Sequence, residues 1–278
     1  MIYKMYKKLI IFLISVIISF FLFSIYKNKR ITGYASSIIY NINKSLQKNN
    51  IQKILKQKTI VSLPIIEETE EIPKIIFQTH KKKELIPNYY VKNLKNLNKD
   101  WDYRFFDNQD AKKFLREEFG KEFEDKFDYF KTGPHKADLW RLCILYKYGG
   151  CYLDADIEML VPFDNIINKC NEKLIIPQSL NIDSSTRLFI ALIICNKGNK
   201  MIGECIKRMM LVENKHIKFY HFNLEMMDII LKETLNYKIF ENYMPKKYIN
   251  WGVNPKDCFI TYEDKTKIAK SKRDDYIC

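Results

Sequence analysis

Residues 136–156 constrain the fold most, because they read as a helix, a double-glycine stop and a strand that ends in two aspartates. Apolar residues recur at steps of three and four up to Tyr148, which predicts a helix with one apolar face. Gly149 and Gly150 then end the helix, since glycine readily adopts the left-handed backbone found at helix ends. The strand is predicted over residues 151–156. This order indicates an α/β unit with acidic side chains where a strand ends.

The acidic residues of this strand are Asp154 and Asp156. Side chains alternate between the faces of a strand, so both carboxylates are expected on the same face as Tyr152. Two neighbouring carboxylates repel each other unless a cation lies beside them, and oxygen ligands suit Mg²⁺ or Mn²⁺. An Asp-x-Asp pair is also common in solvated turns, so the motif alone is weak evidence. In this context it predicts a metal site.

Two charged residues of the preceding helix are candidates for the same site. Asp138 and Arg141 lie three residues apart and therefore project from one face of the helix. Without the acidic strand nearby, they would be interpreted as a surface ion pair that contributes a few tenths of a kcal/mol.

The combined pattern resembles a family of glycosyltransferases, the sugar-binding type that contains a DXD motif. This family includes the fungal initiating mannosyltransferases and the lactosylceramide galactosyltransferases, and the large glucosylating bacterial toxins are more distantly similar. The shared signature is Ala-Asp-Leu-x-Arg followed by Gly-Gly-x-Tyr-x-Asp-x-Asp. The chain carries all of it, as Ala137, Asp138, Leu139, Arg141, Gly149, Gly150, Tyr152, Asp154 and Asp156.

Two further stretches resemble strands of the same family. Residues 72–80, IPKIIFQTH, are similar to its opening strand, with Phe77 and His80 where His and Trp are usual. Residues 101–107, WDYRFFD, are similar to its second strand, and a looser likeness continues through residues 187–202. The resemblance therefore covers roughly residues 72–163.

The resemblance implies a GT-A-like α/β fold, in which a mostly parallel central sheet is flanked by helices. It also implies a retaining transfer of a hexose from a nucleotide-diphosphate sugar, UDP- or GDP-linked, to a hydroxyl of a glycan, glycolipid or glycoprotein. The cofactor would be Mn²⁺ or Mg²⁺. The leaving phosphate would accept the proton, so no protein base is assigned.

The same resemblance assigns roles to individual residues. Asp156 would bind the metal, and Asp154 would bind the metal and reach the ribose or sugar. Asp138 and Arg141 would hold hydroxyl groups of the donor sugar. Phe77, Gln78 and Thr79, at the end of the first strand, would bind the donor. Asn254, late in the chain, would be a further metal ligand. For the late histidines His216 and His221, a surface position is favoured.

The positive charge belongs mainly to the N-terminal part of the chain. The formal charge is +14, and residues 1–58 hold eleven Lys or Arg and no acidic residue. The remainder holds 36 basic against 33 acidic residues, so it is only about +3. This distribution argues against a nucleic-acid partner. With 278 residues and 47% hydrophobic content, the chain can bury one substantial core.

Residues 9–26 form an apolar run that is near the length needed to cross a bilayer. A cleaved signal peptide is the competing interpretation, but basic residues rather than a small-x-small site follow directly. The predicted organisation is a basic tail (1–8), a transmembrane signal anchor (9–26), a basic stem (27–71) and a catalytic domain (72–278). Basic residues flank both sides of the apolar run, and the resemblance implies a single-pass type II protein whose domain lies in the lumen of the Golgi or endoplasmic reticulum.

Within the domain, short apolar strands alternate with helices. The expected strands are residues 74–78, 103–106, 151–156, 174–177 and 188–195. The expected helices are residues 110–119, 135–148, 201–212 and 224–234, and a further short helix is expected at 42–58 in the stem.

Three other classes of protein are alternative interpretations of the Asp-x-Asp motif. A phosphatase with an Asp-x-Asp nucleophile usually has Thr or Val at the position of Glu158 and carries the motif near the start of its domain. A calcium loop that begins at Asp154 would need Gly where Met159 stands and Glu where Asn165 stands. The remaining alternative is a catalytically inactive, membrane-tethered module that binds a sugar nucleotide or a glycan.

Overall fold

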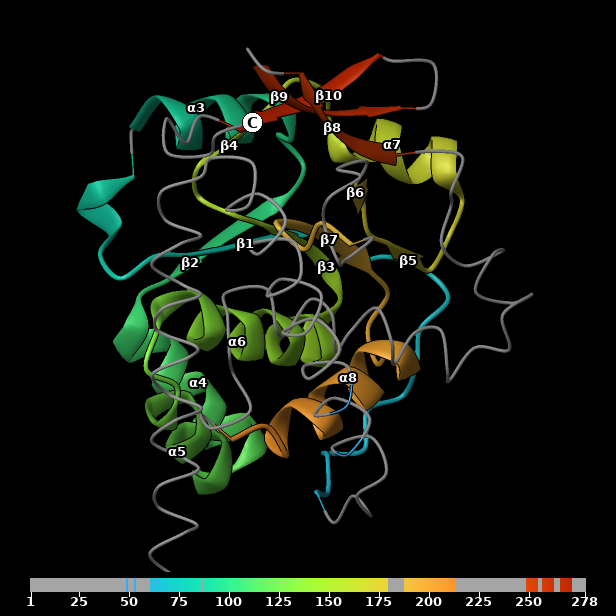
Figure 1. Cartoon of the computed structure of the whole chain (residues 1–278). Coiled ribbons are helices and arrows are strands. Elements are labelled where there is room, and N and C mark those ends of the chain that lie inside the picture. The colour runs from blue at the N-terminus through green and yellow to red at the C-terminus, as the bar shows by residue number, and fades with distance from the viewer. Residues whose placement is uncertain are drawn as a thin grey trace, which may run out of the picture. The chain divides into compact units, whose positions relative to one another are not determined.

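The structure is a computed structural model that describes residues 49, 53, 61–86, 88–179, 188–213, 249–254, 257–262 and 266–271. All of these except position 49 belong to one compact unit, Lys53–Cys278 (Figure 1). The predicted membrane anchor at 9–26 and the predicted helices at 42–58 and 224–234 lie essentially outside the described residues. None of the helices that are described combines the length and the apolar character that crossing a bilayer requires.

The central sheet has five strands in the order β2-β1-β3-β7-β5. Strand β1 pairs in parallel with β2 and with β3, whereas β7 is antiparallel to both β3 and β5. Four strands therefore run in one direction and β7 runs against them, as a mostly parallel sheet requires. The bounds are Ile75–Thr79 (β1), Asp102–Phe106 (β2), Gly150–Leu153 (β3), Leu174–Ile175 (β5) and Leu192–Cys195 (β7).

Helices cover both faces of this sheet, as expected for an α/β fold. Figure 1 shows α4, α5, α6 and α8 on one side of it and α3 and α7 on the other. The helices are α3 (Asn88–Leu97), α4 (Asn108–Phe119), α5 (Lys121–Tyr129), α6 (Gly133–Tyr148), α7 (Phe163–Cys170) and α8 (Lys200–Met210), and a 3₁₀ helix η1 spans Lys83–Leu85.

A second sheet has the strand order β4-β10-β9-β8-β6. Its pairs are antiparallel except for β6 and β8, which are parallel. The strands are β4 (Ile157–Met159), β6 (Gln178–Ser179), β8 (Ile249–Asn254), β9 (Asp257–Tyr262) and β10 (Lys267–Ser271). Because β4 follows β3 after three residues, the chain passes directly from the central sheet to the second sheet.

Several predicted boundaries are wrong. The strand expected at 151–156 ends at Leu153, and residues 154–156 form a turn into β4. The strands expected at 188–195 and 174–177 are both shorter, and a separate strand, β6, follows the second of them. Helices α3, α5 and α7 and strands β8, β9 and β10 were not predicted.

Helix α6 is buried on more than one face, unlike the one-sided helix that the sequence predicts. Nine of its sixteen residues are buried, including Asp138 and Arg141. It contacts α4, α5 and α8 as well as strands β1 and β3. Trp140 is fully buried and packs against Phe106 and Tyr152, with ring centroids 5.1 and 6.2 Å away. The helix that carries the candidate charged pair is therefore held firmly.

The turn from α6 into β3 requires both of its glycines. Gly149 and Gly150 have φ values of 68° and 98°, which side chains with a Cβ rarely adopt. A Cβ at Gly150 would lie 2.5 Å from the carbonyl oxygen of Ile75 on β1. The double glycine therefore lets β3 approach β1 at the centre of the sheet, and its role as a helix stop is confirmed.

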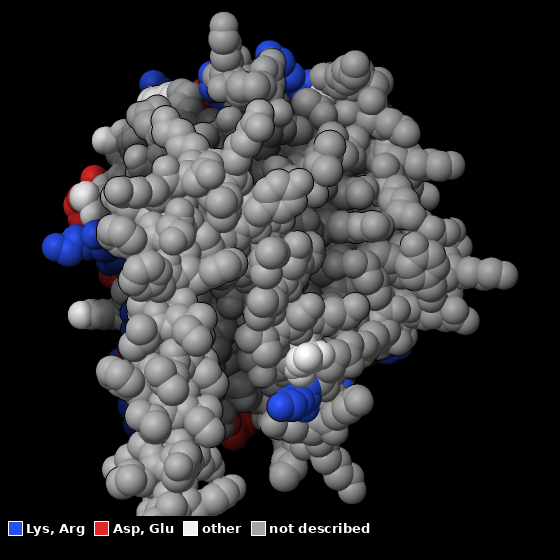
Figure 2. Space-filling model, in the orientation of Figure 1, with Lys and Arg blue, Asp and Glu red and all other residues white. Residues whose placement is uncertain are grey.

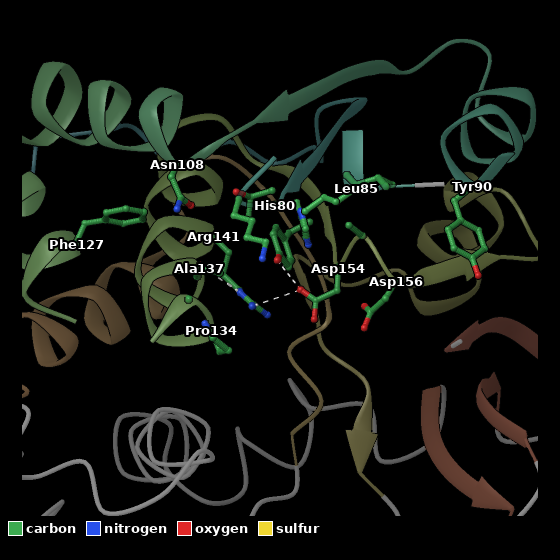
Figure 3. Close-up of a pocket in the computed structure, with 16 residues that line it drawn as sticks. His80, Leu85, Tyr90, Asn108, Phe127, Pro134, Ala137, Arg141, Asp154 and Asp156 are labelled. Atoms are coloured by element: carbon green, nitrogen blue, oxygen red, sulfur yellow. Dashed lines mark hydrogen bonds and ion pairs between the residues drawn. The ribbon is translucent and has the colours of Figure 1, made fainter. Parts of the chain in front are cut away.

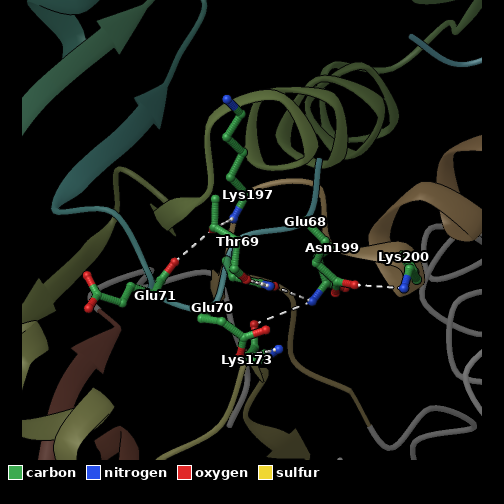
Figure 4. Close-up of polar contacts among 9 residues, drawn as sticks. Glu68, Thr69, Glu70, Glu71, Lys173, Lys197, Asn199 and Lys200 are labelled. Carbon is green, nitrogen blue, oxygen red and sulfur yellow. Dashed lines mark hydrogen bonds and ion pairs between the residues drawn. The ribbon is translucent and has the colours of Figure 1, made fainter. Parts of the chain in front are cut away.

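Residues 61–71, which the sequence assigns to the stem, run along the domain (Figure 4). The backbone N–H of Thr69 donates to the carbonyl of Lys197 at 3.0 Å, and its hydroxyl accepts from the N–H of Lys197 at 3.2 Å. Glu70 pairs with Lys173 at 2.7 Å and Glu68 with Lys200 at 3.1 Å. This segment is therefore fastened to the loop before α8 and to α8 itself.

Candidate functional site

The acidic pair lies in the turn between the two sheets. The N–H of Asp154 donates to the carbonyl of Ala191 at 2.8 Å, and the N–H of Ile157 donates back to the carbonyl of Asp154 at 3.1 Å. Residues 154–156 therefore follow the carboxyl end of β3, where ligands bind in sheets of this kind. Both carboxylates line one cavity, and Figure 3 shows them directed to the same side of the turn.

The carboxylate of Asp154 is held by two partners. The Tyr152 hydroxyl donates to its Oδ1 at 2.5 Å, and Nη2 of Arg141 lies 3.4 Å from the same oxygen. Burial raises the pKa of Tyr152 well above its ordinary value, so the phenol keeps its proton and remains a donor. The side chains of Tyr152 and Asp154 therefore meet, although Asp154 lies in the turn after β3 and not in the strand itself.

The charged pair on α6 is a buried ion pair, not a surface one. Nη2 of Arg141 lies 3.2 Å from Oδ1 of Asp138, and each side chain is 6% exposed. Arg141 also donates from Nη1 to the carbonyl of Ile190 at 2.6 Å and lies over the Tyr152 ring at 4.4 Å. Arg141 lines the cavity and bridges Asp138 to Asp154, which links the helix to the acidic turn.

The end of β1 contributes to the site in two ways. Gln78 is 1% exposed, donates from Nε2 to the carbonyl of Asp154 at 3.4 Å and accepts from the Tyr103 hydroxyl at 3.0 Å. It therefore supports the acidic turn from behind. Thr79 lines the cavity, while its hydroxyl donates to the carbonyl of Phe106 at 2.8 Å. Phe77 is fully buried in the core beside Tyr148 and is not among the lining residues.

The cavity has a volume of about 480 Å³, within the range of small-molecule sites. In Figure 3, Phe127 and Tyr90 lie at opposite ends of the labelled set, with Arg141 and Asp154 between them. The lining combines two kinds of side chain. The charged and polar ones are Thr79, His80, Lys81, Asn108, Arg141, Asp154 and Asp156, and the mainly apolar ones are Leu85, Ile86, Tyr90, Phe127, Pro134 and Ala137.

The donor atoms at the turn fit Mg²⁺ or Mn²⁺ rather than a softer metal. Among the residues described, no three His, Cys, Asp or Glu side chains gather around one point. Two carboxylates and open space suit a hard cation that takes its other ligands from water and phosphate oxygens. Both Asp154 and Asp156 line the cavity in which such an ion would be held.

The late candidate ligand and the late histidines are not placed by the structure. Asn254 is the last residue of β8, opposite Asp257 of β9, and its side chain lies outside what is described. His216 and His221 also lie outside the described residues.

Several contributors to this site were given no role from the sequence, among them Tyr152, His80 and Lys81. Tyr152 orients Asp154, although its place two residues before Asp154 on the same strand face was a signal for that contact. His80 and Lys81 line the cavity from the loop after β1, and nothing in their local pattern indicates it.

The chain was compared with known families and proteins. Residues 86–172 match the family described as "Glycosyltransferase sugar-binding region containing DXD motif". This segment contains α6, the double glycine and the acidic turn. The predicted resemblance to DXD-containing glycosyltransferases is therefore confirmed over this segment.

Several of the matching proteins are fungal. Inositol phosphoceramide mannosyltransferase 3 of Schizosaccharomyces pombe is 37% identical over 89 residues, which cover 31% of this chain and 24% of that protein. Mannosyl phosphorylinositol ceramide synthase SUR1 of Saccharomyces cerevisiae is 36% identical over 88 residues, which cover 31% of this chain and 22% of that protein. The matched region thus spans about a quarter of the length of these relatives.

Among solved structures, the PaToxG glycosyltransferase aligns with 73% of this chain and 86% of its own. The TM-score is 0.41 and the sequence identity 15%.

Proposed function

We propose that this protein is a metal-dependent, retaining glycosyltransferase that moves a hexose from a nucleotide-diphosphate sugar to a hydroxyl group. The observation that carries the proposal is the arrangement of Asp154, Asp156 and Arg141 around one cavity at the carboxyl end of β3. The match of residues 86–172 to the glycosyltransferase family model supports the same reaction class.

The chain's own residues divide the work of binding the donor. Asp156 and Asp154 would hold Mn²⁺ or Mg²⁺, which when bound neutralises negative charge on the departing diphosphate. Arg141 presents a fixed guanidinium at the cavity wall, suited to a sugar hydroxyl or a phosphate oxygen. Asp138 keeps that guanidinium in place and is itself a candidate for a sugar hydroxyl.

The donor-binding set extends to the end of β1. Thr79 is at the cavity wall and is proposed to contact the donor directly, whereas Gln78 and Phe77 would act by fixing the strand behind it. Asn254 is retained as a proposed late metal ligand. Proton transfer is assigned to the leaving phosphate, as in the family.

The acceptor is proposed to be a glycolipid. The fungal relatives are named as mannosyltransferases of inositol phosphoceramide, which makes GDP-mannose and this lipid the first pair to test. A glycan or glycoprotein acceptor is the next choice. The apolar run at 9–26 supports a single membrane anchor. The type II orientation and the lumenal domain are proposed from the resemblance.

The direct test is transfer of radiolabelled hexose from UDP- or GDP-sugars, with Mn²⁺ or with chelator, by the full chain in detergent. We expect transfer with at least one donor in Mn²⁺ and none in chelator. The variant Asp156→Ala should abolish it. Donor binding without hydrolysis or transfer would identify a catalytically inactive binding module instead.

A further inference from the structure

One exposed segment beside the cavity concentrates positive charge. Residues 81–99 contain six lysines and one glutamate, a net charge of +5. Residues 59–278 as a whole are only about +3, so the rest of that part of the chain is slightly acidic. We call residues 81–99, which form η1 and α3, the basic rim. Its lysines are Lys81, Lys82, Lys83, Lys92, Lys95 and Lys99, and all six are exposed.

The lysines of the basic rim differ from several other lysines of the domain. Within the described part of the chain, none of the six forms an ion pair, whereas Lys112, Lys147 and Lys173 pair with carboxylates within 2.7 Å. Two of the rim lysines lie over aromatic rings instead: Lys83 over Phe105 and Lys95 over Tyr103. Among the described residues, the six ammonium groups of the rim are therefore not neutralised by direct ion pairs.

The fold keeps this charge facing outwards. On α3, Leu94 is 2% exposed and Asn93 donates to the carbonyl of Met159 at 2.8 Å, which fixes one side of the helix against β4. Lys92 and Lys95 lie on the exposed side. Figure 2 shows basic and acidic side chains together at the left margin, the side on which Figure 1 places α3.

Large apolar side chains are exposed within the same rim. Leu85 is 53% exposed and Tyr89 is 47% exposed, and both lie within the lysine-rich segment. Apolar and aromatic side chains set among lysines are typical of surfaces that lie on anionic bilayers, where the rings and aliphatic groups enter the interface and the ammonium groups meet phosphates.

The basic rim also forms one side of the cavity. Lys81, Leu85, Ile86 and Tyr90 line it together with Asp156. Figure 3 shows Leu85 and Tyr90 on the Asp156 side of the labelled residues. A bilayer in contact with the rim would therefore lie next to the cavity mouth.

We propose that the basic rim is a membrane-docking surface that rests on anionic lipid headgroups. Docking there would let an acceptor hydroxyl on a lipid headgroup enter the cavity while its acyl chains stay in the bilayer. The docking itself is independent of the reaction, whereas the delivery of a lipid acceptor rests on the glycosyltransferase function proposed above.

The test uses the full chain reconstituted in vesicles of phosphatidylcholine, with or without phosphatidylserine. Amide hydrogen exchange of residues 81–99 should be about tenfold slower in the anionic vesicles, because each lysine near such a surface adds to the attraction. High salt should remove the protection, since it screens exposed charges. Equal exchange in both lipids would overturn the proposal.

Two triple variants with the same loss of charge distinguish an effect of the basic rim from an effect of the protein's total charge. Lys82→Gln, Lys92→Gln and Lys99→Gln together should return exchange to the level seen in phosphatidylcholine. Lys113→Gln, Lys121→Gln and Lys131→Gln change the charge equally on other elements and should keep the protection. If both triple variants behave alike, the rim is not the docking surface.

Two further readouts complete the test. Donor hydrolysis in detergent should be the same for the rim variant and the parent protein, so loss of docking and failure of the proposed function give different results. Short duplex DNA that protected residues 81–99 as strongly as the anionic vesicles would also overturn the proposal and assign the rim to nucleic acid.

Discussion

The Tyr152 hydroxyl donates a 2.5 Å hydrogen bond to Oδ1 of Asp154, the first carboxylate of the acidic turn. The phenol is 1% exposed, and burial raises its pKa, so it stays protonated over the working pH range. Arg141 Nη2 approaches the same oxygen at 3.4 Å. One oxygen of Asp154 is thus committed to the protein, and Oδ2 is the oxygen better placed to serve a ligand.

Replacing Tyr152 with Phe tests this contact with almost no change in shape. A hydrogen bond to a charged group contributes about 1.5–3 kcal/mol, so nucleotide release should fall about 10- to 100-fold. The fold should persist, as judged by circular dichroism. Steady-state kinetics at varied Mn²⁺ would show whether the variant also needs more Mn²⁺. An unchanged rate of nucleotide release would mean that Asp154 does not depend on the hydrogen bond from Tyr152.

The buried pair of Asp138 and Arg141 predicts a loss of stability. Asp138→Ala leaves a guanidinium buried with one partner fewer, and removing one member of a buried pair typically destabilises by about 3–5 kcal/mol. Denaturant unfolding measures the change. Asp128→Ala is the control, because the Asp128 side chain is 49% exposed and its pair with Lys112 should contribute at most about 1 kcal/mol. Similar values for the two variants would contradict the buried network.

Asn199 should be important for stability although it is far from the acidic turn. Its Oδ1 caps α8 by accepting from the N–H groups of Met201 and Ile202, and its Nδ2 donates to the buried Asn196 at 2.7 Å. Asn199→Ala should destabilise by about 1–3 kcal/mol through loss of the cap and an unsatisfied amide. Thermal unfolding is the measurement, and a shift below about 1 °C would argue against this arrangement.

Lys126 predicts a pH dependence of stability. Burial lowers its pKa from 10.5 to about 8, while its ammonium group donates to the carbonyl of Val212. Between these pH values the unfolded chain binds more protons than the folded chain, so this residue makes stability rise with pH from about 8 to 10.5. Lys126→Met should remove that rise, by at most about 3 kcal/mol. The measurement is the free energy of unfolding at pH 7 to 10, with Lys121→Met as an exposed control. If Lys126→Met shows the same slope with pH as the parent protein, the explanation is wrong.

Residues close in sequence made much of the fold predictable. The helix, the double glycine and β3 follow one another locally, and Gly150 meets β1 because only glycine fits there. The end of β3 could not be predicted, because it depends on β4 pairing with β10 more than a hundred residues later. The supporting role of Gln78 could not be predicted for the same reason, because its contacts are with β2 and the acidic turn, which are distant in sequence.

The site was predicted in part for a similar reason. Asp154, Asp156 and Arg141 belong to one continuous stretch, and the structure brings them to one cavity. Lys81 and Tyr90 reach that cavity from the connection between β1 and β2, whose course is set by α3 packing on β4. No short-range pattern specifies such packing.

The central claim is that the acidic turn binds a sugar nucleotide through a divalent cation. The most direct measurement is calorimetric binding of GDP-mannose and UDP-hexoses to the full chain in detergent, with Mn²⁺ and with chelator, for the parent protein and Asp156→Asn. We predict that one donor binds at least about tenfold more tightly with Mn²⁺ and that the variant loses this difference. Equal affinity in chelator, or an Asp156→Asn variant with full Mn²⁺ dependence, would contradict the claim.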